Sequence, residues 1–305
     1  MRTIAAALAL ALMLPALARA APAGGPIVVS SKIDTEGTLL GSMILAVLAA
    51  RGLKVENRLA LGPTNIMRTA IRSGQIDVYP EYTGNGAFFF HRENDPAWKD
   101  RQRGYDLVKR LDLERNHLVW LTPAPANNTW VIAVRADLAR RHHLKTMEDF
   151  ARYVNGGGSV KLAASAEFVE SPAALPAFEK TYGFRLSDRQ LVTLSGGNTA
   201  ATERAAAEQM SGVNAAMAYG TDGALPALGL VALDDDKGAE IVYAPAPVAR
   251  AAVLARHPEI APALDRVFAG LTLETLQRLN ARVAVDGDSA AAVVAAYLKA
   301  KHLLP

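Results

Sequence analysis

The sequence YPEYTGNGAFFF, residues 79–90, combines aromatic rings with a turn and a single carboxylate, Glu81. Pro80 cannot continue a helix, and the run TGNG at 83–86 is typical of a turn, so we expect Tyr82 to project from a strand end into a cleft. Exposed aromatic rings at strand ends commonly bind ligands. The alternative is that these rings belong to the core, which the run of phenylalanines at 88–90 favours for its own members.

Short apolar strands and amphipathic helices alternate on both sides of this stretch. The alternation predicts an α/β fold with parallel or mixed sheets covered by helices. The expected strands lie at 27–29, 55–61, 76–79, 130–134 and 160–163. The expected helices lie at 39–48, 65–73, 147–153, 175–182 and 200–210, followed by two more that begin near Thr272 and Ser289.

Two segments rich in proline, glycine and asparagine look like crossings between domains. They read TPAPANNTW at 122–130 and AYGTDGALPALG at 218–229. A chain that leaves one lobe at the first segment and returns at the second forms a discontinuous lobe 1, residues 26–128 and 223–305, and a contiguous lobe 2, residues 129–222. Two such crossings make a hinge. The length of the chain also favours about two domains.

Residues 1–20 are typical of a cleaved secretory signal peptide. Arg2 precedes an apolar run at 4–14 that is too short to span a bilayer, and the residues at 18–20 form a small-residue cleavage site. The chain has no cysteine, which excludes a lipid anchor and disulfides. Loss of Arg2 and Arg19 lowers the formal net charge from +3 to +1, so charge gives little reason to expect a nucleic acid or a membrane as a partner.

Motifs for the common catalytic and cofactor sites are missing. The sequence has no G-x-S-x-G elbow, no H-E-x-x-H pair, no Walker loop and no cysteine nucleophile, and we expect neither a cofactor nor a metal. His142 and His143 are neighbours that point to different helix faces, and the acidic run at 234–236 lacks the spacing of a calcium loop. The run SGGN at 195–198 fits either an anion cradle or a loop that caps the next helix.

Four aromatic residues stand at or beside expected hinge segments or strand ends: Tyr82, Trp130, Tyr219 and Tyr243. Their comparable positions predict that the rings converge on one cleft between the lobes. Each ring face carries partial negative charge, so such a cleft attracts a quaternary ammonium group by roughly 0.5–2 kcal/mol per ring. The alternative for each residue is a half-buried ring that packs at a domain boundary.

Short motifs along the whole chain resemble those of one family. They are SKIDTEG at 31–37, LGPTN at 61–65, GQIDVYPEYTGN at 74–85, NNTW at 127–130, AEF at 166–168, YGTDG at 219–223 and LNARV at 279–283. In this order and spacing they resemble the substrate-binding proteins of glycine betaine, choline and carnitine ABC transporters. The resemblance implies a type II periplasmic-binding-protein fold, with two lobes joined by a two-strand hinge that close over a ligand.

The resemblance also implies a set of binding residues. Tyr82, Trp130, Tyr219 and Tyr243 match the family's cage around a trimethylammonium group, and Asn65 matches a position near the ligand. Relatives commonly place an arginine for the betaine carboxylate after the EF motif, where this chain has Val-Glu-Ser at 169–171. Loss of that guanidinium weakens carboxylate binding or shifts the preference to another quaternary amine, unless Lys32 replaces it.

The expected function is therefore that of a periplasmic solute-binding component of an ABC importer. It would act as a monomer, capture glycine betaine or a similar quaternary ammonium solute with modest affinity, and deliver it to an inner-membrane permease with its ATPase. Two alternatives remain open. One is an exported enzyme that acts on a small cationic or zwitterionic metabolite, with Glu81 or Glu167 as general acid or base. The other is a sensory or chaperone-like periplasmic protein that does not transport.

Overall fold

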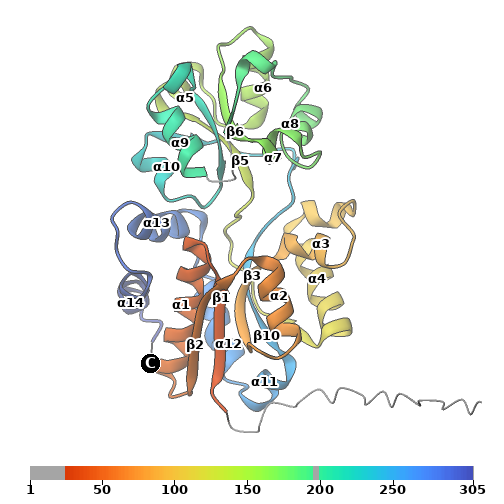
Figure 1. The fold of residues 1–305 in the computed structure, drawn as a ribbon, viewed down its shortest axis with the longest axis vertical. Coiled ribbons are helices and arrows are strands. Elements are labelled where there is room, and N and C mark those ends of the chain that lie inside the picture. Colours follow the sequence, from red (N-terminus) through yellow and green to blue (C-terminus); the bar gives the residue numbers. More distant parts are fainter. Residues whose placement is uncertain (1–24, 195–198, 305) are drawn as a thin grey trace, which may run out of the picture.

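The computed structural model describes residues 25–194 and 199–304 as two α/β lobes, each built around its own sheet (Figure 1). The expected signal peptide at 1–20 and the run SGGN at 195–198 lie outside the described residues.

The sheet of lobe 1 has five strands in the order β2-β1-β3-β10-β4. Strand β1 pairs in parallel with β2 and β3, while β10 runs antiparallel to both β3 and β4, so the sheet is mixed. The strands are β1 (Ile27–Lys32), β2 (Val55–Gly62), β3 (Val78–Tyr82), β4 (Leu118–Trp120) and β10 (Pro245–Arg250).

Helices cover this sheet and bury its apolar faces. In α1 (Thr35–Ala50), Asp34 caps the first turn by accepting a hydrogen bond from the backbone N–H of Gly37, and the helix packs its leucine and methionine side chains against β1, α13 and α14. The other helices are α2 (Thr64–Arg72), α3 (Gly86–Phe89), α4 (Arg101–Asn116), α11 (Ala251–Arg256), α12 (Ile260–Phe268), α13 (Leu273–Ala284) and α14 (Ala290–Ala300).

The sheet of lobe 2 also has five strands, in the order β7-β6-β8-β5-β9. Its central strands β6 and β8 are almost completely buried, and they read as continuous apolar runs. The strands are β5 (Trp130–Arg135), β6 (Leu162–Ser165), β7 (Leu191–Leu194), β8 (Ala215–Tyr219) and β9 (Leu230–Ala232). The helices are α5 (Ala136–His142), α6 (Met147–Asn155), α7 (Ala166–Glu170), α8 (Leu175–Tyr182), α9 (Thr199–Ala207) and α10 (Ala224–Ala227).

The chain crosses from lobe 1 to lobe 2 between β4 and β5 and returns between β9 and β10. The second crossing lies later in the chain than expected. Residues 223–232, which we expected in lobe 1, stay in lobe 2, because β9 pairs with β5 in antiparallel register. The cluster of glycine and proline at 218–229 forms a turn and the short helix α10 within lobe 2, and a three-residue edge strand leaves too weak a pattern to recognise.

A buried ion pair joins α2 to α4 in lobe 1. The guanidinium of Arg68 donates to both carboxylate oxygens of Asp112, and the indole N–H of Trp120 and the amide of Asn116 also donate to Asp112. Asp112 is completely buried. The bonds satisfy the carboxylate. Burial lowers the pKa of Arg68, but the hydrogen bonds and charge of Asp112, together with Tyr79 and Glu81, raise it overall.

We expect Asp112→Ala to lower the free energy of unfolding by about 3–5 kcal/mol, because it leaves Arg68 buried without a counter-charge. Glu114→Ala is the matched control, since it breaks the exposed pair with Arg110 on the same helix. That change is expected to cost less than about 1 kcal/mol. Urea unfolding of both variants measures the difference, and similar losses in the two would contradict the prediction.

Candidate functional site

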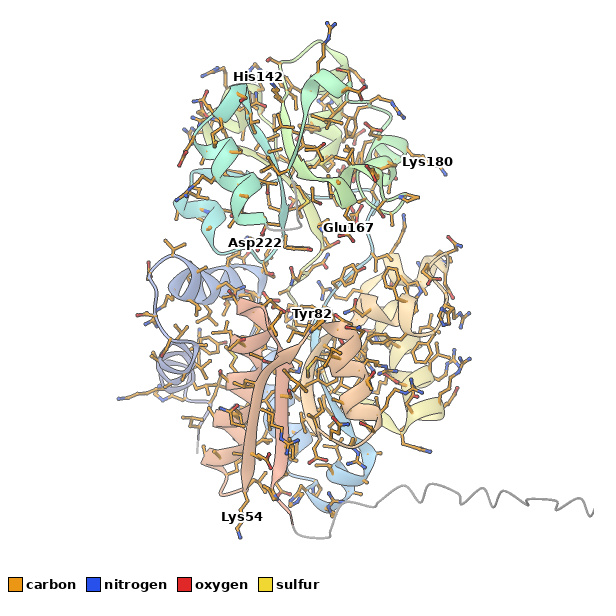
Figure 2. The ribbon with its side chains drawn as sticks, viewed as in Figure 1. Lys54, Tyr82, His142, Glu167, Lys180 and Asp222 are labelled. Carbon is orange, nitrogen blue, oxygen red and sulfur yellow. The ribbon has the colours of Figure 1, made fainter. Side chains whose placement is uncertain are left out.

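A cavity of about 840 Å³ lies between the lobes, and residues from both lobes and from the crossing segments line it. In Figure 2, Tyr82 lies at the edge of lobe 1 that faces lobe 2, and Glu167 and Asp222 lie at the edge of lobe 2 that faces lobe 1. His142 lies at the far end of lobe 2, away from the cavity.

Two of the four expected rings come from paired strands of lobe 2. Trp130 begins β5 and Tyr219 ends β8, and the two residues are register partners across the antiparallel pair. Their rings stack with centroids 6.4 Å apart and an interplanar angle of 18°. The ring of Phe168 packs edge-on against Trp130 at 5.8 Å. The sheet and this core contact therefore fix both rings at the wall of the cavity.

Tyr82 lines the cavity from lobe 1. It is the last residue of β3, as the turn signal predicted, and it is only 6% exposed. Its hydroxyl donates to Glu36 at 2.8 Å, and the ammonium of Lys32 lies 4.5 Å from its ring centroid. The ring is thus held by a carboxylate at its hydroxyl and by a cation at its face.

Tyr243 lies in the second crossing segment. Its backbone N–H donates to the side chain of Asn127, and its carbonyl accepts from the backbone N–H of Asn128. Gly84 makes room for the ring, since a Cβ at that position would lie 2.8 Å from a ring carbon of Tyr243. Burial raises the pKa of Tyr243, as it does for Tyr82 and Tyr219, so the phenols stay neutral.

The two remaining expected residues differ in position. Lys32 lines the cavity, but its ammonium is 2.6 Å from Glu81. Asn65 is exposed in the first turn of α2 and does not line the cavity, whereas its neighbour Thr64 does. That the four rings and Lys32 bind a ligand stays a prediction.

The environment of Glu81 is that of a structural carboxylate. Glu81 is completely buried and accepts hydrogen bonds from Lys32, the hydroxyl of Tyr79, the backbone N–H of Tyr82 and the amide of Asn85. Glu167 instead lies exposed in the first turn of α7 in the other lobe. These two carboxylates are not arranged as an acid–base pair.

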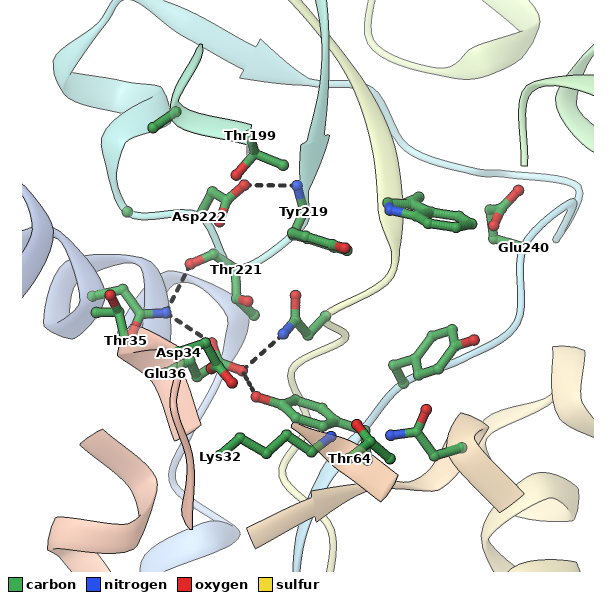
Figure 3. A pocket seen from close by; sticks show the side chains of 18 of the residues that line it. Lys32, Asp34, Thr35, Glu36, Thr64, Thr199, Tyr219, Thr221, Asp222 and Glu240 are labelled. Atoms are coloured by element: carbon green, nitrogen blue, oxygen red, sulfur yellow. Dashed lines mark hydrogen bonds between the residues drawn. The ribbon is translucent and has the colours of Figure 1, made fainter. Parts of the chain in front are cut away.

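Sequence reasoning missed the acidic character of the cavity. Six carboxyl groups line it, and Lys32 is the one basic side chain among its described lining residues. The carboxyl groups belong to Asp34, Glu36, Glu167, Glu203, Asp222 and Glu240, several of which Figure 3 labels. Four of them stand inside quoted motifs, Asp34 and Glu36 in SKIDTEG, Glu167 in AEF and Asp222 in YGTDG, but Glu203 and Glu240 lie outside every motif.

Three of these carboxyl groups are buried, and their pKa values are raised. Burial raises the pKa of Glu36 to about 7, although hydrogen bonds from Thr221, Asn280 and Tyr82 oppose the shift. Burial and then the carboxylate of Asp222 raise the pKa of Glu203 to about 9. Each shift has the sign expected when a carboxylate loses its water without gaining a cation.

Five buried side-chain atoms have no hydrogen-bond partner in the described part of the chain, and all five belong to residues that line this cavity. They are Oδ1 of Asn128 and Asn280, Nε1 of Trp130, and Oε1 of Glu203 and Glu240. Buried polar atoms are almost always paired in native proteins, so their concentration here marks a place where a ligand or water completes the structure.

The segment Val-Glu-Ser at 169–171 forms the last two residues of α7 and its C-cap. Ser171 lines the cavity, while Glu170 is exposed and is not among the lining residues. Val169 packs against the core of lobe 2. The position where the resemblance implies an arginine is thus open to the cavity at Ser171.

Within residues 25–194 and 199–304, no group of three or more His, Asp or Glu side chains is placed to hold a metal ion. No helix in these ranges is long and apolar enough to cross a membrane.

Comparison with known proteins agrees with this architecture. Residues 25–300 match the family model for the substrate binding domain of ABC-type glycine betaine transport systems. The glycine betaine-binding protein YehZ of Escherichia coli is 57% identical over 289 residues, which cover 95% of each chain. A glycine-betaine-binding protein of Pseudomonas aeruginosa is 32% identical over 284 residues, covering 90% of this chain and 88% of that one.

The fold is also that of a solved relative. The structure of apo YehZ superposes with a TM-score of 0.86 at 58% identity and covers 92% of this chain and all of its own. The expected two-lobed binding-protein fold is therefore confirmed. With a family match over nearly the whole described length and two relatives above 30% identity, the chain belongs to the family of substrate-binding domains of ABC-type glycine betaine transport systems.

Proposed function

We propose that this protein captures a quaternary ammonium solute in the cavity between its lobes. The observation that carries the proposal is the meeting of Tyr82, Trp130, Tyr219 and Tyr243 at one cavity that six carboxyl groups also line. Ring faces attract a cation without hydrogen bonds, which suits an ammonium that has no N–H. The exposed carboxylates of the lining, Asp34 and Glu167, add a favourable potential for a cation and an unfavourable one for an anion.

Glycine betaine is the solute that the names of the most similar relatives support. It carries a carboxylate as well as an ammonium, and the cavity offers that carboxylate no free cation among the described lining residues, since Lys32 is paired with Glu81. Neutral donors or water must then bind it. We therefore propose modest affinity for glycine betaine, on the order of micromolar to millimolar.

Membership of the same family also supports a proposal for the cellular setting. We propose that residues 1–20 direct export and are then cleaved, and that the protein acts as a monomer in the periplasm. There it delivers its solute to an inner-membrane ABC permease with its ATPase. Lobe 1 and lobe 2 close over the solute, and the crossings near Asn128 and Tyr243 form the hinge. The alternative of an exported enzyme has no support in the arrangement of Glu81 and Glu167.

We expect Tyr82→Phe and Tyr219→Phe to largely keep the affinity for glycine betaine, because the ring face remains. Tyr82→Ala and Tyr219→Ala are expected to weaken binding at least about tenfold, or 1.4 kcal/mol. Titration calorimetry on folded variants measures this. If both alanine variants bound glycine betaine as tightly as the unchanged protein does, the cage would be refuted.

We expect Ser171→Arg to tighten glycine betaine, because a guanidinium at this position pairs with the carboxylate in a charge-assisted, bidentate manner. Choline has no carboxylate and is expected to bind unchanged or more weakly, so it serves as the matched ligand control. Titration of both ligands into both proteins tests the idea. Nanomolar glycine betaine binding by the unchanged protein, or no gain from arginine, would show that other groups bind the carboxylate.

We expect the lobes to close about the two crossings when ligand binds, because a ligand that contacts both lobes favours the closed state. Small-angle X-ray scattering with and without saturating glycine betaine measures the change as a decrease in the radius of gyration. An unchanged radius at saturation, checked by calorimetry under the same conditions, would argue against hinge closure.

A further inference from the structure

The three buried carboxyl groups of the cavity differ in what surrounds them. Glu36 accepts hydrogen bonds from Tyr82, Asn128 and Asn280. Glu203 lies near the carboxyl group of Asp222, whose negative charge adds to the effect of burial in raising the pKa of Glu203. Glu240 is 5% exposed, and its Oε1 is buried without any hydrogen-bond partner in the described part of the chain. Oε1 of Glu203 also lacks a partner, so what distinguishes Glu240 is its position on the crossing segment that carries Tyr243.

Backbone contacts hold Glu240 in place at the start of the second crossing. The carboxylate of Asp235 accepts hydrogen bonds from the backbone N–H groups of Ala239 and Glu240, and the ammonium of Lys99 donates to the carbonyl of Ala239 at 2.6 Å. On the other side, the hydroxyl of Thr129 donates to the carbonyl of Ile241 at 2.8 Å. The side chain is therefore presented from a fixed backbone, and Figure 3 shows it on the crossing segment that borders the cavity.

These contacts also bring the segment of Glu240 close to two residues of the cage, Trp130 and Tyr243, which line the same cavity. Thr129 directly precedes Trp130, and Ile241 directly follows Glu240. The hydrogen bond from Thr129 to Ile241 therefore brings these two chain segments together. Tyr243 follows three residues later on the same segment, and the charge of Glu240 is the largest influence after burial on the pKa of Tyr243. A cation between these rings would lie close to the Glu240 carboxyl group.

The charged groups around Glu240 leave it neutral in the ligand-free protein. Burial, followed by the carboxylate of Asp235 on the same loop, raises the pKa of Glu240 to about 9, and Lys99 from lobe 1 opposes the shift. The phenol of Tyr243 is neutral. Near pH 7 the side chain is thus a carboxylic acid that holds a proton.

We propose that Glu240 is the counter-ion of the ligand's ammonium group, and that capture of a cation by the cage releases the Glu240 proton to solvent. The inference rests on the proposed function and extends it. No covalent bond other than the O–H bond changes. One positive charge enters the cavity and one leaves it, so the net charge of the closed site stays constant.

The exchange has a physical reason and a definite sign. A buried carboxylate without a cation and a buried cation without an anion are each costly, whereas the pair is much less so. A bound cation therefore lowers the pKa of Glu240 from its ligand-free value of about 9. Affinity then rises with pH by up to about tenfold per unit between the ligand-bound and ligand-free pKa values, and it levels off above the ligand-free value.

Choline is the probe of choice, because its charge does not change with pH in this range. Titration calorimetry in two buffers with different protonation enthalpies gives the number of protons released per choline bound. At about pH 7 we expect close to one proton for the unchanged protein, and an affinity that rises through about pH 9. The uncharged analogue, in which a tert-butyl group replaces the trimethylammonium group, is expected to bind more weakly and to release none.

Two matched variants assign the proton. Glu240→Gln is expected to release almost no proton and to lose most of the pH dependence, whereas Glu148→Gln, which changes an exposed carboxyl group outside the cavity, is expected to keep both. The proton count of the unchanged protein stands even if a variant does not fold. Choline binding without proton release, or release that persists in Glu240→Gln, overturns the inference while the proposed function stands. Failure of choline, glycine betaine and carnitine to bind at every pH overturns both.

Discussion

The hydrogen bonds between the two crossing segments are the constraint on which the site depends. The side chain of Asn127 and the backbone of Asn128 bind Tyr243 from both sides, and Thr129 binds Ile241. Segments more than a hundred residues apart in the sequence thus form one short ribbon between two sheets. Tyr243 belongs to this ribbon and Trp130 directly follows it. The same hydrogen bonds therefore set the geometry of the cage and that of the hinge.

A second group of contacts ties α13 of lobe 1 to the loop that follows β8 in lobe 2. Asn280 donates to both Glu36 and the carbonyl of Thr221, and Gln277 donates to the carbonyl of Gly220. Gly223 leaves no room for a side chain, since a Cβ there would lie 2.1 Å from the backbone nitrogen of Ala281. Residues of the motifs SKIDTEG, YGTDG and LNARV contact one another at this point. The three motifs, although far apart in the sequence, therefore form one structural unit.

The sequence predicted the parts of the fold and site that leave local signals. Strand β1, helix α1 and the turn after Tyr82 follow from apolar periodicity and from proline and glycine, and the fold class follows from the βα alternation. The second crossing was misplaced, because sheet membership of β9 depends on pairing with β5 and not on its own three residues. The acidic lining was not predicted, although Glu240 stands three residues before Tyr243 and four of the six carboxyl groups lie in quoted motifs, because only tertiary packing brings these segments to one cavity.

The acidic lining has a consequence for the ionic strength at which the protein works. Attraction between exposed carboxylates such as Asp34 and Glu167 and a distant cation acts over a Debye length of about 10 Å in 0.1 M salt, but over only about 3 Å in 1 M salt. Contacts with the ring faces act at closer range and in a partly buried site, where salt has much less effect. Concentrated salt should therefore lower the association rate of the solute more than it raises the dissociation rate of the complex. At high salt the protein would bind its solute slowly but still retain it once bound.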